Sequence, residues 1–581
     1  MISDIQVMIA GHAGDGVLFT GNVLGKILKR QGWEVVTYRD FPSNIRGEAT
    51  NYTIRASLEK ITNRGDYIDV LMAFDCDAIL RHISSVAANG VVLCEGGQTE
   101  SVRISPRRGR TFHKFPMREL ATQNFNSEIF KNTILLGGLC YILDLDLDIL
   151  KDVLTEVFIT RKGQEIVDTN IRAMQLGCDE AAKIVAKEEK HSLVKRPDKD
   201  RLFISGDEAI ALGALAAGCR FFAAYPICPA TEIWQWLLKY IHEFNGLVIQ
   251  TEDEIAAINM ALGAAYSGVR AMTSTSGPGG SLMMEGFSLS GIAEIPIVIA
   301  HLQRVGPSTG LPTRPEQSDL NQWVFGAHGD FPRIVLSPGT IEECFYFMTD
   351  AFNLAESYQC PVILLTEQNY GQNYFTVDKF DLSRVAIDRG LLLAQDELLK
   401  IKDYKRYALT ENGISPRAVP PMVNGIHMVE GNEHDEKGYR DEEEEIRIRM
   451  MNKRMTKLEV ASKDLIPAQL WGREDADIGI IGFGSTVCPI REAMDRLEDK
   501  GISTKYLQVR TLWPFATAEA ETFMRSCDTV FVVENNYSGQ LSRLIQGQGV
   551  ECSRVHKINK YSGHTFRPIE IAESMLKVLE R

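Results

Sequence analysis

Two polar segments in the middle of the chain combine residue types that could bind and activate a small acid. Thr251-Glu-Asp-Glu254 follows a predicted strand, and a buried carboxylate at that position could hold or transfer a proton. Arg304 precedes Ser308 and Thr309, and an arginine beside hydroxyls can bind a carboxylate through both arms of its guanidinium. Both segments also have a structural interpretation, because Thr251-x-x-Glu254 has the spacing of a helix capping box and single arginines are usually surface charges.

Two further loops could shape a binding site around these segments. Residues Tyr225-Pro-Ile227-Cys228-Pro229 lie between a predicted strand and a predicted helix, and the prolines fix a rigid, extended loop. Such a loop could hold a small substrate or could simply connect the two elements. Residues Ser274-Thr-Ser276-Gly-Pro-Gly279-Gly280 end a strand in a glycine-rich turn, which suits an anion or the close approach of a ligand to the backbone.

A third loop, Gly11-x-x-Gly14-x-Gly16, lies between a strand and a helix near the start of the chain. Glycines there let the backbone approach a phosphate at the helix N-terminus, although the spacing differs from the G-x-G-x-x-G of dinucleotide-binding proteins. The polar segment that follows the next strand contains Ser43, Asn44 and Arg46. Because the ends of neighbouring strands line one crevice of an open sheet, both segments could bind a phosphate-bearing ligand there. A plain strand-to-helix turn is the alternative.

The elements that must position these residues form three predicted α/β units. The first opens with strand 5–10, helix 17–28 and strand 34–38, and it ends at the charged stretch 187–201. The second begins near Leu202, closes near 361–366 and has expected strands at 221–225, 247–250, 271–274 and 295–300. The third covers 477–581. Residues 377–460 are predicted to be an irregular connector, and its acidic run Glu442–Glu445 a solvated surface.

Composition excludes several classes of function. The 581 residues include 63 Lys+Arg against 77 Asp+Glu, a net charge of −14, which argues against a general attraction to nucleic acid or to an anionic membrane. No apolar run reaches the length of a membrane helix and the N-terminus lacks the layout of a signal peptide, so a cytoplasmic protein is expected. The 11 cysteines include no C-x-x-C pair, so neither a zinc site nor an iron–sulfur cluster is predicted on this chain.

Together, these motifs closely resemble the fused gamma-alpha subunit of the 2-oxoacid:ferredoxin oxidoreductases, in the type that acts on 2-oxoglutarate. The resemblance spans the whole chain and rests on Gly206-Asp-Glu-Ala-Ile210, Tyr225-Pro-Ile-Cys-Pro229, Glu254 with Gly263, Thr275-Ser-Gly-Pro-Gly279, Gly306-Pro-Ser-Thr-Gly310 and Glu534-Asn-Asn-Tyr-Ser-Gly539. It implies a multi-domain α/β fold. The implied parts are a Rossmann-like gamma domain at 1–190, a pyrimidine-type thiamine-diphosphate-binding domain at 200–390, a connector at 391–464 and a transketolase C-terminal-like domain at 465–581.

The resemblance also implies the activity and the partners. An alpha subunit of this family would work with a beta subunit to interconvert 2-oxoglutarate, coenzyme A and oxidised ferredoxin with succinyl-CoA, carbon dioxide and reduced ferredoxin. Thiamine diphosphate would be shared between the two subunits, and the beta subunit would hold Mg²⁺ and the 4Fe–4S cluster. The expected assembly is α2β2, and the alpha subunit alone is expected to be inactive.

The resemblance also implies roles for individual residues, each at the position of this sequence that matches the family's motif. Glu254 is similar to the glutamate that hydrogen-bonds the aminopyrimidine ring and is expected to be catalytic, with Ile227 and Ser276 as further cofactor contacts. The residues expected at the substrate are Cys228, Arg304, Ser308 and Thr309. Cys228 stands where the family has threonine, and a thiol is the weaker hydrogen-bond donor, so the substrate is left open. The residues expected to contact coenzyme A are Gly14, Asp15, Gly16, Ser43, Asn44 and Arg46.

Three alternatives stay open beside this interpretation. The same chemistry could act on pyruvate or on a branched 2-oxo acid. A nicotinamide dehydrogenase could be built on the first glycine loop, although the loop spacing disfavours it. The chain could also be a non-catalytic scaffold that only docks a beta subunit.

Overall fold

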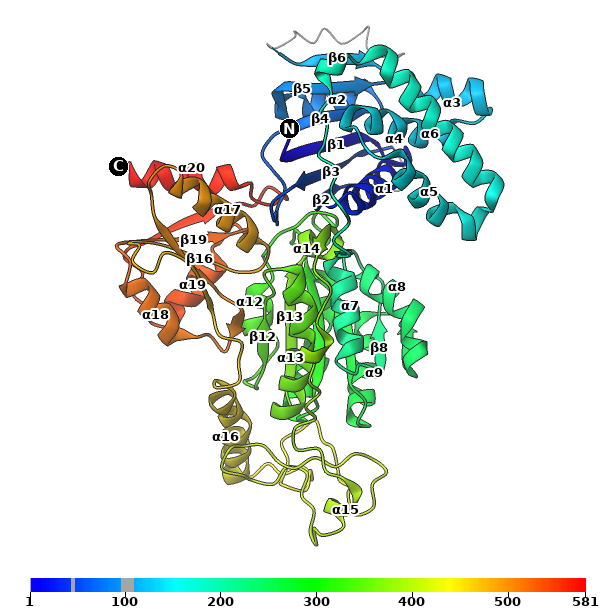
Figure 1. The fold of residues 1–581 in the computed structure, drawn as a ribbon. Helices are drawn as coiled ribbons and strands as arrows, with labels where there is room; N and C mark the ends of the chain where they lie inside the picture. Colours follow the sequence, from blue (N-terminus) through cyan, green and yellow to red (C-terminus); the bar gives the residue numbers. More distant parts are fainter. Residues whose placement is uncertain (1, 43–46, 96–108, 581) are drawn as a thin grey trace. The chain divides into compact units, whose positions relative to one another are not determined.

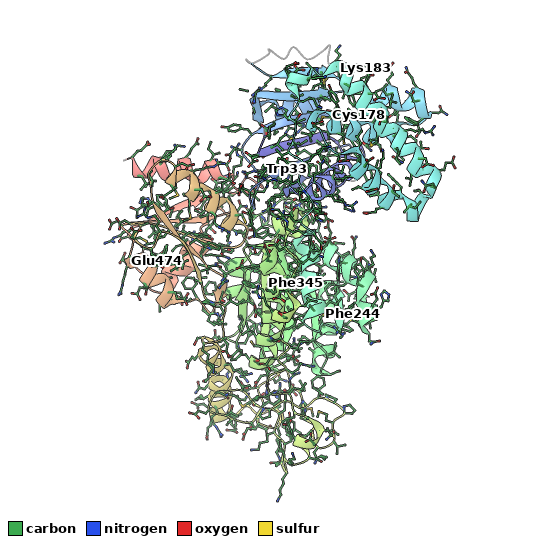
Figure 2. The ribbon with its side chains drawn as sticks, in the orientation of Figure 1. Trp33, Cys178, Lys183, Phe244, Phe345 and Glu474 are labelled. Atoms are coloured by element: carbon green, nitrogen blue, oxygen red, sulfur yellow. The ribbon has the colours of Figure 1, made fainter. Side chains whose placement is uncertain are left out.

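The chain folds into two compact units, which are described separately (Figure 1). The computed structural model describes residues 2–42, 47–95 and 109–580. The first unit contains residues 1–204 and 373–379, and the second contains residues 205–372 and 380–581. Trp33 and Phe345 are fully buried side chains in the first and second unit respectively (Figure 2).

The first unit is built on an eight-stranded sheet in the order β6-β5-β4-β1-β3-β2-β14-β7. Its strands are β1 (Asp4–His12), β2 (Glu34–Asp40), β3 (Ala49–Ser57), β4 (Ile68–Ala73), β5 (Val86–Cys94), β6 (Thr111–Lys114), β7 (Leu202–Ser205) and β14 (Tyr374–Val377). β3 runs antiparallel to both β1 and β2, with His12 opposite Ala49 and Asp40 opposite Asn51. The carboxyl ends of β1 and β2 therefore lie at the same edge of the sheet, as predicted, but the two strands are not neighbours because β3 lies between them.

Six α-helices lie in the part of the first unit that the structure describes. They are α1 (Val17–Arg30), α2 (Cys76–His82), α3 (Met117–Phe125), α4 (Lys131–Leu143), α5 (Leu147–Lys162) and α6 (Gln164–Ile184). α4 and α6 approach closely because each places a glycine at the contact. A β-carbon on Gly137 would lie 2.0 Å from the Met174 carbonyl, and one on Gly177 would lie 1.9 Å from the Ile134 carbonyl. Any larger residue at either glycine would separate the two helices.

The second unit begins with a seven-stranded sheet in the order β18-β12-β13-β11-β10-β8-β9. Its strands are β8 (Phe221–Ala224), β9 (Leu247–Gln250), β10 (Ala271–Thr275), β11 (Ile297–Gln303), β12 (Ile334–Leu336), β13 (Pro361–Glu367) and β18 (Thr511–Trp513). All pairs are parallel except that of β12 with β18. Every residue of β10, β11 and β13 is buried, as expected for a parallel sheet covered on both faces.

Helices connect these strands in the β-α alternation that parallel sheets require. They are α7 (Gly206–Ala216), α8 (Thr231–Tyr240), α9 (Glu254–Tyr266), α10 (Gly277–Leu282), α11 (Met284–Ile292), α12 (Leu320–Phe325), α13 (Ile341–Tyr358) and α14 (Gln368–Gln372). The loops that leave the carboxyl ends of β8, β9, β10 and β11 contain the four segments singled out in the sequence, so the topology gathers them at one edge of the sheet.

A five-stranded sheet in the order β15-β17-β16-β19-β20 completes the second unit. Its strands are β15 (Gln469–Gly472), β16 (Ile478–Gly482), β17 (Thr504–Gln508), β19 (Thr529–Glu534) and β20 (Val555–Asn559). Its helices are α17 (Val487–Glu498), α18 (Thr517–Arg525), α19 (Gln540–Gly547) and α20 (Pro568–Leu579). Only β15 is antiparallel to its neighbour. No helix in the described ranges is both long and apolar enough to cross a bilayer.

The segment between the two sheets of this unit differs from the irregular connector predicted. It contains α15 (Gln395–Leu398) and the 18-residue helix α16 (Glu444–Ala461). The buried face of α16 carries Lys453, Arg454 and Lys457, so the apolar period that identifies a helix in a sequence is missing. The run Glu442–Glu445 is exposed, as predicted. Ahead of the connector, residues 373–379, expected in the second domain or the connector, form part of the first unit, where β14 pairs with β2.

Candidate active site

Glu254 opens α9, but the cap of this helix is not the predicted one. The Asp253 carboxylate accepts a hydrogen bond from the Ala256 backbone at 2.7 Å, which makes Asp253 the N-cap. The predicted capping box at Thr251 is wrong, because Thr251 Oγ1 donates instead to the Asp253 carbonyl at 2.8 Å. Since Asp253 caps the N-terminus of α9, the Glu254 carboxylate does not cap the helix and is available for other contacts.

The Glu254 carboxylate lies against the glycine turn that follows β10. Glu254 is only 5% exposed, and a β-carbon placed on Gly279 would lie 2.4 Å from its Oε1 and 2.1 Å from Thr275 Oγ1. Burial raises the pKa of the Glu254 carboxyl, and the nearby positive charge of Arg304 opposes that rise. A carboxyl with a raised pKa holds its proton more readily, which suits a group that exchanges a proton with a bound ligand.

Arg304 comes directly after β11 and is 6% exposed. Its Nη1 donates to the Cys228 carbonyl at 2.6 Å, which ties the loop after β11 to the proline loop after β8. Its Nε is buried and has no hydrogen-bond partner among the described residues. The guanidinium therefore keeps donor capacity beyond the bond that fixes it, as a residue that binds a carboxylate needs.

Cys228 is half-buried in the proline loop, with Gln372 Nε2 3.8 Å from its Sγ. Burial raises the pKa of the Cys228 thiol to about 11, and Arg304 opposes that rise. The thiol is therefore neutral near pH 7 and is a weak hydrogen-bonding group rather than a nucleophile. Ile227, beside it, is also half-buried.

Ser276 lies at the N-cap position of α10 without capping it. The residue is fully buried, and its Oγ has no hydrogen-bond partner among the described residues. A buried hydroxyl without a partner is unusual in a folded protein and often marks a position that a ligand satisfies. The segment after β10 thus offers an unpartnered hydroxyl at Ser276, while the Glu254 carboxylate packs directly on Gly279.

A histidine–aspartate pair that the sequence analysis missed lies beside this turn. His301 on β11 is fully buried, and its Nε2 lies 2.8 Å from Asp319 Oδ2. Asp319 also lies near Gly277, where a β-carbon would be 3.4 Å from Oδ2. The charge of Asp319 is close enough to affect the pKa values of Arg304 and of the buried Glu316. The polar run 315–319 after the Gly310 loop was the available sequence signal.

Ser308 and Thr309 are not gathered with these residues. Both are exposed at the tip of a loop that the Val305 backbone closes, through bonds of 3.0 Å to Arg314 and 3.1 Å to Leu311. Ser308 has a positive φ of 56°. Among the described residues, neither hydroxyl has a contact with Arg304, so the assignment of Ser308 and Thr309 to the substrate stays a prediction.

The Glu534 motif has a structural role in this unit. The buried Glu534 carboxylate accepts hydrogen bonds from the backbones of Leu541 and Ser542 at 2.7 and 2.9 Å, at the start of α19. Asn535 donates to the Pro315 carbonyl at 3.1 Å and so holds the polar run 315–319 against the second sheet. The motif therefore holds a segment next to the site in place and is not itself part of the site.

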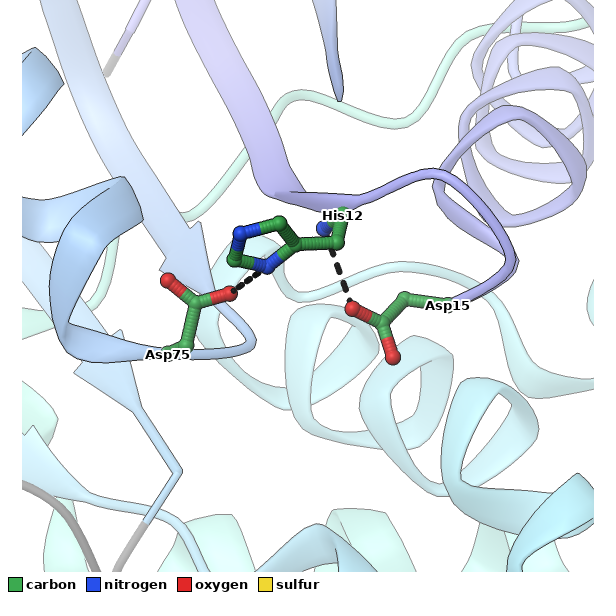
Figure 3. Close-up of side chains that lie close together, drawn as sticks. All are labelled: His12, Asp15 and Asp75. Carbon is green, nitrogen blue, oxygen red and sulfur yellow. Dashed lines mark hydrogen bonds and ion pairs between the residues drawn. The ribbon is translucent and has the colours of Figure 1, made fainter. Parts of the chain in front are cut away.

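In the first unit, the predicted glycine turn is organised by Asp15 (Figure 3). Asp15 Oδ2 accepts a hydrogen bond from the His12 backbone at 3.0 Å, and Oδ1 lies 2.7 Å from Lys131 Nζ and 3.1 Å from Arg118 Nη2. The Asp15 carboxylate is thus held by partners within the first unit, and its assignment to coenzyme A stays a prediction. Gly14 and Gly16 have φ values of 102° and 86°, which only glycine adopts readily. Ser43, Asn44 and Arg46 lie outside the described residues.

The second-unit residues together fit a nitrogen heterocycle bound beside a small acid. No described residue forms an ion pair with Glu254, and the Ser276 hydroxyl has no hydrogen-bond partner among the described residues. Arg304 supplies the positive charge that a substrate carboxylate requires. The chemistry available to such an arrangement is proton exchange at the heterocycle and electrostatic binding of the acid.

Three family models match the chain. The model described as pyruvate flavodoxin/ferredoxin oxidoreductase, thiamine diphosphate-binding, matches residues 212–453. The model described as pyruvate ferredoxin/flavodoxin oxidoreductase matches residues 6–180, and the model for core domain II of pyruvate:ferredoxin oxidoreductase matches residues 476–571.

The chain is also similar to individual relatives and to a solved structure over long stretches of its sequence. Subunit alpha of 2-oxoacid:ferredoxin oxidoreductase 2 from Aeropyrum pernix is 30% identical over 99% of this chain and 98% of the relative. The 2-oxoglutarate synthase subunit KorA of Methanothermobacter thermautotrophicus is 36% identical over 65% of this chain and 99% of the relative. A structure of 2-oxoglutarate:ferredoxin oxidoreductase from Magnetococcus marinus, with 2-oxoglutarate, coenzyme A and succinyl-CoA bound, aligns with a TM-score of 0.92 at 33% identity, covering 99% of this chain and 100% of that one.

Proposed function

The chain belongs to the 2-oxoacid:ferredoxin oxidoreductase family as an alpha subunit, and on that premise we propose that its substrate is 2-oxoglutarate. The reaction proposed is the interconversion of 2-oxoglutarate, coenzyme A and oxidised ferredoxin with succinyl-CoA, carbon dioxide and reduced ferredoxin. The observation that carries the proposal is that a buried Glu254 carboxyl with a raised pKa and a buried Arg304 lie at the same edge of the sheet.

Thiamine diphosphate, when bound, would supply the electron sink that loss of carbon dioxide from a 2-oxo acid requires. Glu254 would hold a proton at the ring nitrogen of the aminopyrimidine, and its raised pKa suits that exchange. Ser276, which precedes the α10 residues on which Glu254 packs, would offer its unpartnered hydroxyl to the same ring.

Arg304 would bind the carboxylate of the substrate. Its Nη1 is fixed by the Cys228 carbonyl while Nε has no partner among the described residues, so the guanidinium is oriented and still able to donate. Cys228 would lie beside the same substrate as a neutral thiol. The relatives and the structure whose names specify 2-oxoglutarate support that substrate over pyruvate or a branched 2-oxo acid.

A partner subunit is part of the proposal. We propose a beta subunit that holds Mg²⁺ and a 4Fe–4S cluster, in an α2β2 assembly that passes electrons to ferredoxin. All 11 cysteines of this chain are free, and their spacing includes no C-x-x-C pair. The electrons released on decarboxylation would therefore leave through iron and sulfur on the partner.

The test is turnover of the complex formed by co-expression with its beta-type partner. Anaerobic ferredoxin reduction would be measured with coenzyme A and with 2-oxoglutarate, pyruvate or 2-oxoisovalerate, and compared by kcat/KM. We expect 2-oxoglutarate to be preferred. Preference for another acid would keep the family and change the substrate, and reduction of NAD instead of ferredoxin would support the dehydrogenase alternative.

Two variants separate an active subunit from a docking scaffold. Glu254→Gln keeps the shape of the side chain and removes its acid–base function, so a loss on the order of 100-fold in kcat is expected. Arg304→Lys is expected to raise KM for the 2-oxo acid by about tenfold or more, because a bidentate arginine contact is lost. Glu252→Gln is the matched control, since Glu252 is exposed two residues away. A scaffold would show wild-type turnover in all three variants.

A further inference from the structure

Helix α10 is packed between two buried polar side chains. A β-carbon on Gly279 would lie 2.4 Å from Glu254 Oε1, whereas a β-carbon on the next residue, Gly280, would lie 3.1 Å from His301 Cε1. Successive residues of an α-helix project about 100° apart, so the two contacts are on different sides of α10. With no side chain at either glycine, the position of the helix depends directly on the groups that it touches.

The histidine on one of these sides is fixed by Asp319. His301 is fully buried on β11, and its Nε2 lies 2.8 Å from Asp319 Oδ2. The backbone N–H of Asp319 donates to Gln303 Oε1 at 2.9 Å, two residues further along the same strand. A β-carbon on Gly277 would lie 3.4 Å from Asp319 Oδ2. The histidine–aspartate pair therefore contacts α10 at both Gly277 and Gly280.

The segment that ends at Asp319 is anchored to the five-stranded sheet of the same unit. The Gln317 backbone N–H donates to the Asn535 carbonyl at 2.8 Å, and the Asn535 backbone N–H donates to Gln317 Oε1 at 2.9 Å. Gln540 Nε2 donates to the Ser318 carbonyl at 2.7 Å. These bonds fix the two residues that precede Asp319, so the pair that contacts α10 has a rigid support.

The imidazole of His301 depends on Asp319 for its orientation. Its Nδ1 is buried and has no hydrogen-bond partner among the described residues. The ring also contacts the edge of Trp323, with ring centroids 5.0 Å apart, but that contact is apolar. A buried nitrogen without a partner is unfavourable, and an apolar side chain would fill the same place without this cost. The chemistry of the position therefore favours a role for the bond to Asp319 over simple packing.

We propose that His301 and Asp319 are positioning residues, which set the place of α10 and thereby the places of the Glu254 carboxylate and the Ser276 hydroxyl. Ser276 directly precedes α10 and Glu254 packs on the helix, so a shift of α10 moves both groups. Arg304 is held by the proline loop instead, so its place does not depend on α10. The inference rests on the proposed function, because Glu254 has a catalytic role only there.

Two substitutions of His301 test whether the hydrogen bond sets the place of α10. Glutamine carries a nitrogen that can replace Nε2 as the partner of Asp319, whereas leucine does not. The first measurement is amide hydrogen exchange of the full chain at Gly280 and Met283, whose N–H groups donate within this segment. His301→Leu is expected to speed exchange by about tenfold or more, the effect of losing one hydrogen bond to a charged group, and His301→Gln to stay within about threefold of the wild type.

The complex with the beta-type partner tests the consequence for catalysis. In His301→Leu, kcat per bound thiamine diphosphate is expected to fall by about tenfold or more, because a small displacement of a catalytic group has effects of this size. His301→Gln is expected to recover most of the rate. KM for the 2-oxo acid should stay within about twofold in both variants, since Arg304 is tied to the Cys228 carbonyl. A mere loss of folded protein would lower the yield of complex and leave kcat per bound cofactor unchanged.

His434→Leu is the matched control, because His434 is also fully buried and its Nδ1 lies 3.0 Å from the Asn432 carbonyl, in the connector. It is expected to leave the exchange of α10 and kcat unchanged. Wild-type exchange and kcat in His301→Leu would overturn the inference, and so would equal losses in His301→Leu and His301→Gln. If His301→Leu does not fold, Asp319→Leu and Asp319→Asn put the same question from the other side of the bond, with faster exchange of α10 expected in Asp319→Leu alone.

The outcomes separate this inference from the proposed function. If the complex reduces ferredoxin with 2-oxoglutarate while His301→Leu leaves the exchange of α10 and kcat unchanged, the function stands and the positioning role is wrong. If the complex shows no turnover with any 2-oxo acid, but His301→Leu speeds exchange in α10 and His301→Gln does not, the pair positions α10 and the proposed function is wrong.

Discussion

The Glu254 carboxylate packs on the α-carbon of Gly279, so closely that a β-carbon at that glycine would lie 2.4 Å from Glu254 Oε1. The two residues are 25 positions apart, on α9 and α10, and Thr275 closes the other side of the same space. The position of the proposed catalytic carboxyl therefore depends on the absence of a side chain in the turn.

Gly279→Ala tests this dependence. The new methyl group would displace the carboxylate from its place against the turn, and we expect kcat of the assembled complex to fall by about 100-fold, as for loss of the acid–base group itself. The measurement is ferredoxin reduction at saturating 2-oxo acid. Gly547→Ala is the matched control, because no atom lies within 4 Å of a β-carbon there. Full activity of Gly279→Ala would mean that the carboxyl acts from another position.

Those parts of the site that depend only on the local sequence can be predicted from it, and those that depend on contacts between distant residues cannot. The strand at 247–250 is predicted by residue type alone and is confirmed as β9. The glycine-rich turn predicted at 274–280 is wrong in part, because β10 ends at Thr275 and the glycines begin the helix α10 at Gly277. The contact of Glu254 with Gly279 is tertiary, and nothing in the local sequence specifies it. The pair of His301 with Asp319 was missed for the same reason, since a lone buried histidine resembles any core residue.

A second buried carboxyl, that of Glu367, is expected to make the free energy of unfolding depend on pH. Glu367, at the end of β13, is fully buried and accepts a 2.6 Å hydrogen bond from Gln317 Nε2. Burial raises the pKa of Glu367 from 4.5 to about 7, against the effect of hydrogen bonds from Gln317 and Ser485. Since the folded state binds this proton more tightly than the unfolded state, the contribution to stability is present below pH 4.5 and is lost as pH rises through about 7.

Glu367→Gln isolates that contribution. A neutral amide keeps an oxygen that accepts from Gln317 and Ser485, but it does not titrate. We expect the difference in free energy of unfolding between Glu367→Gln and the wild type to grow in favour of the variant by on the order of 3 kcal/mol between pH 4.5 and pH 8. Urea titrations across that range measure it. A pH-independent difference would show that Glu367 does not titrate in this window.

The helix that the sequence analysis missed, α16, is held by buried charges rather than by an apolar face. Glu294 is fully buried, lies 2.7 Å from Lys453 Nζ and also pairs with Lys457. The cations hold the pKa of Glu294 well below its usual range, against the opposing effect of burial. Because ion pairs leave no hydrophobic period, this helix could be found only from its tertiary partners.

Glu294→Gln is expected to destabilise the connector strongly. The substitution leaves two ammonium groups buried without their counter-charge, and breaking a buried pair in this way costs about 3–5 kcal/mol. Glu445→Gln, on α16, is the control. The ion pair of Glu445 with Arg449, at 3.8 Å, is exposed, so the free energy of unfolding should change by no more than about 0.5 kcal/mol. Denaturant midpoints of the two variants test the contrast, and equal midpoints would contradict it.

The thiol of Cys228 offers a test of substrate choice that leaves the acid–base group intact. The Arg304 bond in this loop goes to the Cys228 carbonyl, so a side-chain change at this position keeps the loop in place. Burial raises the pKa of the thiol to about 11, so between pH 7 and 8 it is neutral and donates only weakly. A threonine hydroxyl there would be a stronger hydrogen-bonding group with an added methyl.

Cys228→Thr is therefore expected to change the ratio of kcat/KM among 2-oxoglutarate, pyruvate and 2-oxoisovalerate by about fivefold or more, the effect of one hydrogen bond near 1 kcal/mol. The rate with saturating best substrate should change much less, since Glu254 is untouched. Cys552→Ser, at a half-buried thiol near β20, should leave all three ratios as they are. Unchanged ratios in Cys228→Thr would show that the side chain at position 228 does not contact the substrate, and the assignment of Cys228 to the substrate would be withdrawn.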